Sequence, residues 1–101
     1  MTRVQLGTLL KTVSGLTNTV YYQPPPSSKM SYPAIVYSRS DIRNTSADND
    51  IYMQTHHYTI TVIDKNPDSQ IVEAISRIPK IRFNRHYTAD NLNHDVFELY
   101  I

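Results

Sequence analysis

Four histidines are the side chains of this chain best suited to chemistry, because imidazole can act as a base near neutral pH and is a common metal ligand. His56 and His57 are adjacent within a β-prone run. Adjacent side chains on a strand point to opposite faces of the sheet, so these two rings cannot hold one ion together. Neither has a carboxylate beside it at a local metal-ligand spacing. We therefore expect a structural or surface role for both.

His86 and His94 flank the last turn of the chain, where they can face each other across a hairpin. Two histidines without a third ligand make a weak metal site, so metal-free pairing is the preferred interpretation. Asp48, Asn49 and Asp50 resemble half of a calcium-binding loop, but the glycine and the distal glutamate of that pattern are missing. We interpret them as solvated residues, and we predict neither a metal site nor a cofactor.

The sequence shows no serine–histidine–aspartate order, no glycine-rich phosphate loop and no acidic pair, so we predict no catalytic residues and no enzyme activity. Arg82 and Arg85, with His86 and Tyr87, form a basic and aromatic cluster that could bind nucleic acid by charge and stacking. The net charge of +1 is too balanced for a protein that depends on phosphate contacts. A charged outer sheet face is the preferred interpretation, and a nucleic-acid-binding module is kept as an alternative.

Length and composition limit the chain to one small domain, residues 1–101, because 101 residues is close to the commonest domain size. No cysteine is present, which excludes disulfides and thiolate metal sites. No apolar run approaches the roughly 20 residues of a membrane span. The apolar stretch 4–16 is interrupted by polar residues, unlike a signal peptide. We expect no membrane partner.

The spacing of apolar residues predicts two amphipathic helices. Leucines and a valine recur at intervals of three and four over residues 3–15, where Thr2 can cap the start and Gly15 can end the helix. A second helix is expected after Asn66, which can cap it, with Pro67 in its first turn and Pro79 as its stop. Both helices should cover the same face of a sheet.

Strand-like runs fill most of the remaining chain. A short strand over residues 19–23 ends at three prolines, which places it at a sheet edge. Residues 32–43 and 51–65 form a long hairpin, 32–65, around the polar tip 44–50. Residues 80–88 and 94–101 form a last hairpin closed by the turn 89–93. The fold class is therefore α+β, a mainly antiparallel β-sheet of four to five strands with two amphipathic helices packed on one face.

Several segments of this layout match a known pattern. They are YPAIVY at residues 32–37, a polar tip with Ala47 and Asp48, YTITV at residues 58–62, a helix over residues 68–78, and a closing turn over residues 90–95 followed by FELY at residues 97–100. In this order, after an N-terminal helix, they resemble the small tail-terminator (tail-completion) proteins of long-tailed bacteriophages. The resemblance covers nearly the whole chain, and head–tail connector or head-closure proteins of similar size are an alternative.

The resemblance implies a structural protein of the virion, at the head–tail junction. Members of that family form a ring of six subunits that caps the tail tube, stops its growth and offers a surface to the head connector, while double-stranded DNA passes through the lumen. The implied partners are other copies of the chain, the major tail tube protein, the head connector and the DNA. Such a protein is not an enzyme, and the lack of catalytic patterns agrees with this.

The length of the hairpin has its own physical consequence. A strand pair that extends past its core leaves unpaired edges unless a neighbour covers them. We expect ring assembly to cover them, by strand addition or by packing against the next subunit. The residues expected at this interface are Tyr37, Ile51, Tyr52 and Met53. The acidic tip, with Asp48 and Asp50, would face either the lumen, where it would repel DNA phosphates, or the tail tube.

Overall fold

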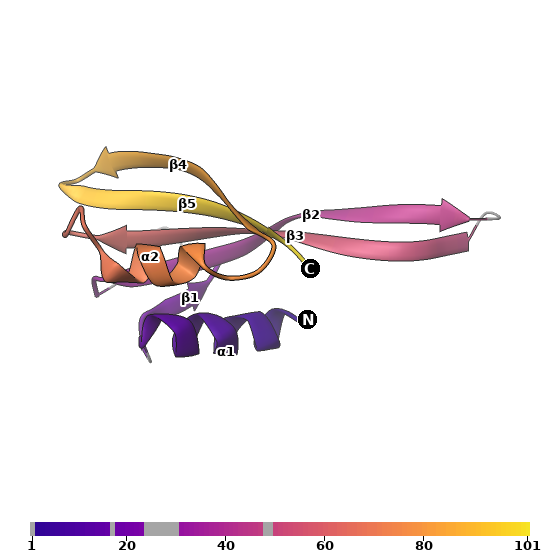
Figure 1. Ribbon diagram of the computed structural model, residues 1–101, viewed down its shortest axis with the longest axis horizontal. Helices are drawn as coiled ribbons and strands as arrows, with labels where there is room; N and C mark the ends of the chain where they lie inside the picture. Colours follow the sequence, from indigo (N-terminus) through magenta and orange to yellow (C-terminus); the bar gives the residue numbers. More distant parts are fainter. Residues whose placement is uncertain (1, 17, 24–30, 48–49) are drawn as a thin grey trace.

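Two helices and one mixed five-stranded sheet make up the fold, which confirms the predicted α+β class (Figure 1). The computed structural model describes residues 2–16, 18–23, 31–47 and 50–101, and the side chains of residues 45–53 lie outside this description. In chain order the elements are α1 (Arg3–Ser14), β1 (Val20–Tyr22), β2 (Ala34–Ala47), β3 (Asp50–Asp64), α2 (Gln70–Ser76), β4 (Ile81–Ala89) and β5 (Leu92–Tyr100).

The strands are arranged in the order β1-β2-β3-β5-β4. β1 pairs with β2 in parallel, and the other three pairs are antiparallel. The sheet is therefore mainly antiparallel, as predicted, and β1 lies at one edge, also as predicted. The chain ends beside the middle of the sheet, because Ile101 exchanges two backbone hydrogen bonds with His56.

The ends of α1 follow from three residues, Thr2 and Gln5 at its start and Gly15 at its end. Thr2 Oγ1 accepts a hydrogen bond from the amide of Gln5, 3.2 Å, and Gln5 Oε1 accepts one from the amide of Thr2, 2.8 Å. This reciprocal capping satisfies two amides that a helix start would otherwise leave without partners. Gly15 ends the helix with φ of 76°, a left-handed conformation that glycine adopts without steric cost. The predicted helix and both its end signals are confirmed.

The start of α2 corrects the sequence prediction. Ser69, not Asn66, caps the helix, and its Oγ accepts the amide of Ile71 at 3.2 Å. Asn66 Oδ1 instead accepts the amide of Asp68 at 2.9 Å, which closes a turn before the helix begins. Both residue types favour caps and turns, and the one closer to the apolar stripe is the cap. The helix also ends at Ser76, three residues before the proline expected to stop it.

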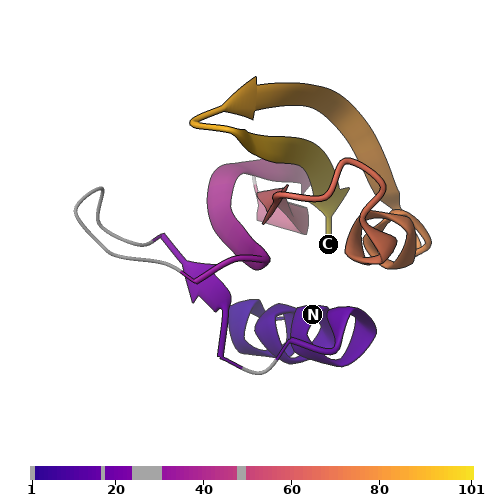
Figure 2. The same ribbon diagram turned by 90° about the vertical axis from the view of Figure 1, so that its left-hand side faces the viewer.

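Both helices lie on one side of the sheet, as predicted (Figure 2). Leu6 and Leu10 of α1 are fully buried, as is Ile75 of α2. They pack on the sheet residues that alternate toward the helices, which are Ile35, Tyr37, Tyr58, Ile60, Val62, Phe97 and Leu99. We call the opposite side the helix-free face. It carries the alternate residues of each strand, such as the threonines of β3.

The β4–β5 hairpin has a shorter turn than predicted. Asp90 and Asn91 alone connect the strands, with φ of 52° and 63°. Two residues with positive φ match the right-handed twist of the flanking strands, and aspartate and asparagine tolerate this conformation. Leu92 and Asn93, expected in the turn, belong to β5.

Candidate functional site

The β2–β3 hairpin continues past the rest of the sheet (Figure 1). On one side, β1 makes its last contact at Tyr37, whose carbonyl accepts the amide of Gln23 at 3.0 Å. On the other side, Ile101 makes the last backbone contact with β3, at His56. From there to the rung between Ala47 and Asp50, β2 and β3 pair only with each other in the part of the chain that is described. We call residues 42–56 the arm.

The arm makes a small chain unusually long. The molecule measures 51 Å along its longest axis, against 29 Å and 24 Å along the others, and its radius of gyration is 14.7 Å. A compact chain of this length would have a radius of gyration of about 13 Å. A two-stranded ribbon is at best marginally stable alone in water, and its unpaired edges favour pairing with another chain.

A β-bulge lies where the arm leaves the sheet. Arg39 pairs with Tyr58 and Asp41 with His57, so Ser40 is an extra residue without a partner across the strands. Such a bulge bends and twists the strand and changes the direction of the side chains beyond it. Here it places Ser40 beside the ring of His57.

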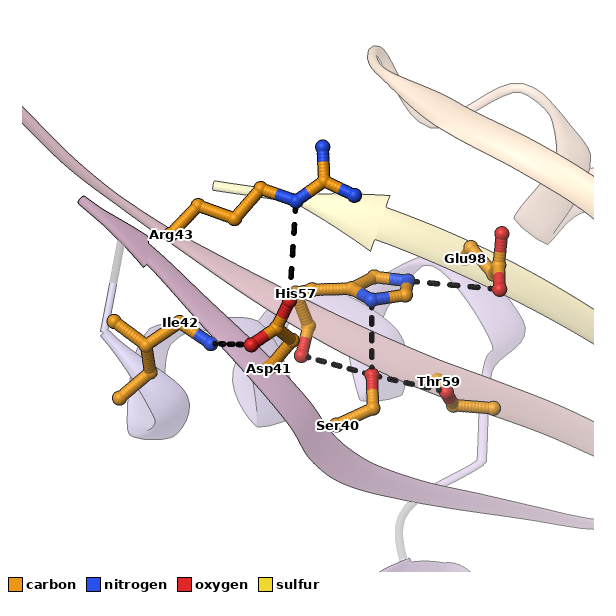
Figure 3. A network of polar contacts seen from close by, with 7 residues as sticks. All are labelled: Ser40, Asp41, Ile42, Arg43, His57, Thr59 and Glu98. Atoms are coloured by element: carbon orange, nitrogen blue, oxygen red, sulfur yellow. Dashed lines mark hydrogen bonds and ion pairs between the residues drawn. The ribbon is translucent and has the colours of Figure 1, made fainter. Parts of the chain in front are cut away.

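Ser40 is the centre of a polar network at this point (Figure 3). Its Oγ lies 3.1 Å from His57 Nδ1, donates to the His57 carbonyl at 3.2 Å, and accepts from Thr59 Oγ1 at 3.3 Å. On the far side of the ring, His57 Nε2 lies 3.7 Å from Glu98 Oε1. The ring also stacks on Tyr100, with centroids 4.4 Å apart and planes 5° apart. The network thus connects β2, β3 and β5.

The order Ser40–His57–Glu98 resembles the arrangement of a nucleophilic triad, and no local spacing in the sequence indicates it. Two features argue against that chemistry. The serine hydroxyl is already bound in three directions, so it is not free to attack a carbonyl group. The distance of 3.7 Å from the ring to Glu98 is beyond a hydrogen bond, and a triad needs the acid to orient the ring. The network fits a structural role at the base of the arm.

The second predicted histidine pair is corrected by the register of β4 and β5. His86 lies opposite Asp95, with Nδ1 and Oδ1 2.9 Å apart, and His94 lies opposite Tyr87, on which it stacks at 4.6 Å. These neighbouring rungs point to opposite faces, so the two histidines do not face each other. No group of three possible metal ligands occurs among the described residues.

The residues predicted for an interface do not lie together in the structure. Tyr37 lies in the core, 6% exposed, with its ring against that of Tyr22 at 5.1 Å, so it presents no surface in the isolated chain. Asp50 and the three residues that follow it form part of β3 within the arm, where only their backbone is described. Asp48 lies outside the described residues.

Arg82 and Arg85, the residues predicted for nucleic-acid contact, both lie on the helix-free face. Arg82 is opposite Glu98 and Arg85 is opposite Val96, because a second bulge leaves Asn84 without a partner. Two residues three apart on a regular strand would point to opposite faces. The Asn84 bulge therefore brings the two arginines to one face.

Two hollows lie beside the base of the arm. One, of about 420 Å³, is lined by Arg43, Lys80, Arg82 and Tyr100, and we call it the basic hollow. The other, of about 340 Å³, is largely apolar and lies between α1 and the end of β5, with Leu9, Pro79 and Ile101 among its walls.

No protein-family model matches the chain, and no curated protein is significantly similar to it. Within the described residues, no helix combines the length and the apolar character that crossing a membrane requires.

Proposed function

We propose that this protein is a structural component of a bacteriophage virion, a tail terminator that forms a ring of six subunits on the end of the tail tube. The ring would end tube growth and join the tube to the head connector, with DNA passing through its lumen. The proposal rests on the resemblance of segments such as residues 32–37 and 58–62, together with the shape of the folded chain.

The main structural support for this proposal is the arm. It projects from the sheet as a two-stranded ribbon, and both its outer backbone edges lack a strand partner among the described residues (Figure 1). Natural proteins protect such edges by covering them or by pairing them. A subunit whose arm lies on its neighbour makes a head-to-tail contact, which closes into a ring when the rotation between subunits allows it.

Contacts at the base of the arm favour one orientation of the arm relative to the sheet. Ser40, His57 and Glu98 link three neighbouring strands at the point where the arm begins. The hydrogen bonds of Ser40 with His57 and Thr59, and the stacking of His57 on Tyr100, restrain the side chains at this point. A rigid base suits an arm that must reach a fixed position on another subunit, and it gives these polar residues a purpose without catalysis.

Assembly of the purified protein tests the proposal. Light scattering and native mass spectrometry over a range of concentrations should show a closed oligomer, or a monomer that assembles only on added tail tubes. A protein that stays monomeric and does not bind tail tubes would overturn it. Binding to head connectors without binding to tubes would favour the alternative of a head-closure protein.

A further inference from the structure

The basic hollow brings together cations from separate parts of the chain. Arg43 comes from β2 at the base of the arm, Lys80 precedes β4, and Arg82 lies within β4, with the ring of Tyr100 from β5 between them. Like charges repel, so a folded chain gathers three of them at one hollow only at a cost in free energy. An anion in the hollow would remove that cost.

The charges of the hollow are poorly neutralised. Arg43 has a carboxylate partner in Asp41, but their closest atoms are 3.8 Å apart and both side chains are more than half exposed. Such pairs contribute little, at most about 1 kcal/mol. Lys80 and Arg82 have no ion pair with any side chain that the structure describes. Glu98, opposite Arg82, is instead within reach of His57 and Asn84.

The bulge at Asn84 extends this group of cations along the sheet. It turns Arg85 to the helix-free face, the same face as Arg82. Arg43, Lys80, Arg82 and Arg85 therefore form a row from the base of the arm along β4, which we call the basic row. A row of positive charges is suited to a ligand with several regularly spaced anionic groups, such as the phosphates of a nucleic-acid backbone. A ligand with a single carboxylate would contact only part of the row. Bulges often re-aim side chains at functional positions.

The aromatic rings beside the basic row already stack on other side chains of the protein. This favours contact with phosphates over stacking with bases. His57 stacks on Tyr100 at 4.4 Å and the Arg43 guanidinium lies 5.2 Å from the centre of the same ring. His94 stacks on Tyr87 at 4.6 Å, and the Arg85 guanidinium lies 5.5 Å from the centre of that ring. Neither ring is open for stacking of a base, whereas the guanidinium groups are exposed and can donate two hydrogen bonds each to phosphate oxygens.

We propose that the basic row binds the phosphate backbone of nucleic acid without reading its sequence. This site shares only Arg43 with the arm, and binding there does not depend on ring formation. If the protein assembles as proposed, the row gives the assembly a direct contact with DNA.

Fluorescence anisotropy with a short labelled DNA duplex at low salt tests this directly. Arg43→Gln with Arg82→Gln removes two charges from the row. The matched control is Lys11→Gln with Arg77→Gln, which removes two exposed charges, one from α1 and one from the residue that follows α2. We expect the first variant to lose roughly tenfold in affinity, with a salt dependence lower by about two ions, and the control to change by less than about twofold.

Two competitors identify the source of the anion. Unlabelled duplex should displace the probe, while inorganic phosphate should do so only at far higher concentration. Equal loss of affinity in the two variants, no binding of duplex at low salt, or tighter binding of poly-glutamate through the same two arginines would each overturn the proposal. Mass measurements in the same samples report assembly separately, so a failure of the ring is not mistaken for a failure of the site.

Discussion

His56 and Ile101 exchange backbone hydrogen bonds of 2.8 Å and 2.9 Å, and they form the last rung between β3 and the chain that follows β5. Beyond this rung, the described strands of the hairpin have only each other as partners. The core, both helices and the polar network lie on one side of it, and the arm lies on the other. The packed core and the arm, which we expect to contact another subunit, are therefore separate parts of the molecule.

Shortening the arm should leave the fold intact. Deleting residues 45–49 joins Asn44 to Asp50 and keeps the rung between Asn44 and Gln54, closed by four residues. Hairpin loops of four residues are common, and no core residue is removed. We expect the far-ultraviolet circular dichroism per residue and the melting temperature to change little. A large fall in melting temperature would show that the arm stabilises the isolated chain.

Gly7 lies under the side chain of Tyr37. This close approach determines how Gly7→Ala changes the free energy of unfolding. A Cβ at Gly7 would lie 2.5 Å from Tyr37 Oη but 3.5 Å from its Cζ. Gly7→Ala should therefore lower the free energy of unfolding by about 1 kcal/mol, because the clash exceeds the gain in helix propensity. With Tyr37→Phe the clash disappears and the same change should stabilise.

Gly15→Ala is the matched control for this pair. It should cost about 1 kcal/mol in both backgrounds, since Gly15 has φ of 76° and open space around it. Chemical denaturation of the single and double variants gives all the values. Stabilisation by Gly7→Ala in the presence of Tyr37 would contradict the packing described.

Alkaline pH should destabilise the protein through Tyr37. Burial raises the pKa of this phenol above its ordinary value of 10.0, although the charge of Arg3 opposes the shift. The unfolded chain then loses the proton first, so the stabilising effect is complete below about pH 10 and is lost as pH rises through the higher folded pKa. Unfolding free energies measured from neutral pH upward should fall above about pH 10. The fall should be smaller in Tyr37→Phe, and an equal fall in both proteins would contradict this.

Ser40 should behave as a structural residue. Its hydroxyl is bound on three sides, so a fluorophosphonate probe should leave it unlabelled under conditions that label a serine hydrolase. Ser40→Ala should cost about 1 kcal/mol of stability. Ser38→Ala on the same strand is the control, and it should cost less, because Ser38 makes no side-chain hydrogen bond to a described residue. Covalent labelling at Ser40 would show that the network is catalytic after all.

Local patterns were enough to predict much of the fold. The apolar spacing and the caps at Thr2 and Gly15 define α1, and the alternation of Tyr58, Ile60 and Val62 defines the buried face of β3. These signals depend on neighbours within a few residues, which a single sequence displays directly. The start of α2 was misplaced because Asn66 and Ser69 compete for the same role and only packing decides between them.

The candidate sites depended on features that a local pattern does not display. The bulges at Ser40 and Asn84 each change which residues share a face, and no spacing in the sequence marks either one. Ser40, His57 and Glu98 are brought together only by the pairing of β2, β3 and β5. Arg85 likewise belongs to the basic row only because one bulge turns it to the face of Arg82.

Native mass spectrometry of the full-length chain and of the variant lacking residues 45–49, with and without tail tubes, tests the central proposal most directly. We expect a closed ring of six subunits for the full-length chain, formed alone or on the tube, and a folded monomer for the variant under the same conditions. It would be contradicted if the full-length chain stayed monomeric and did not bind tubes, or if the shortened chain assembled as well as the full-length one.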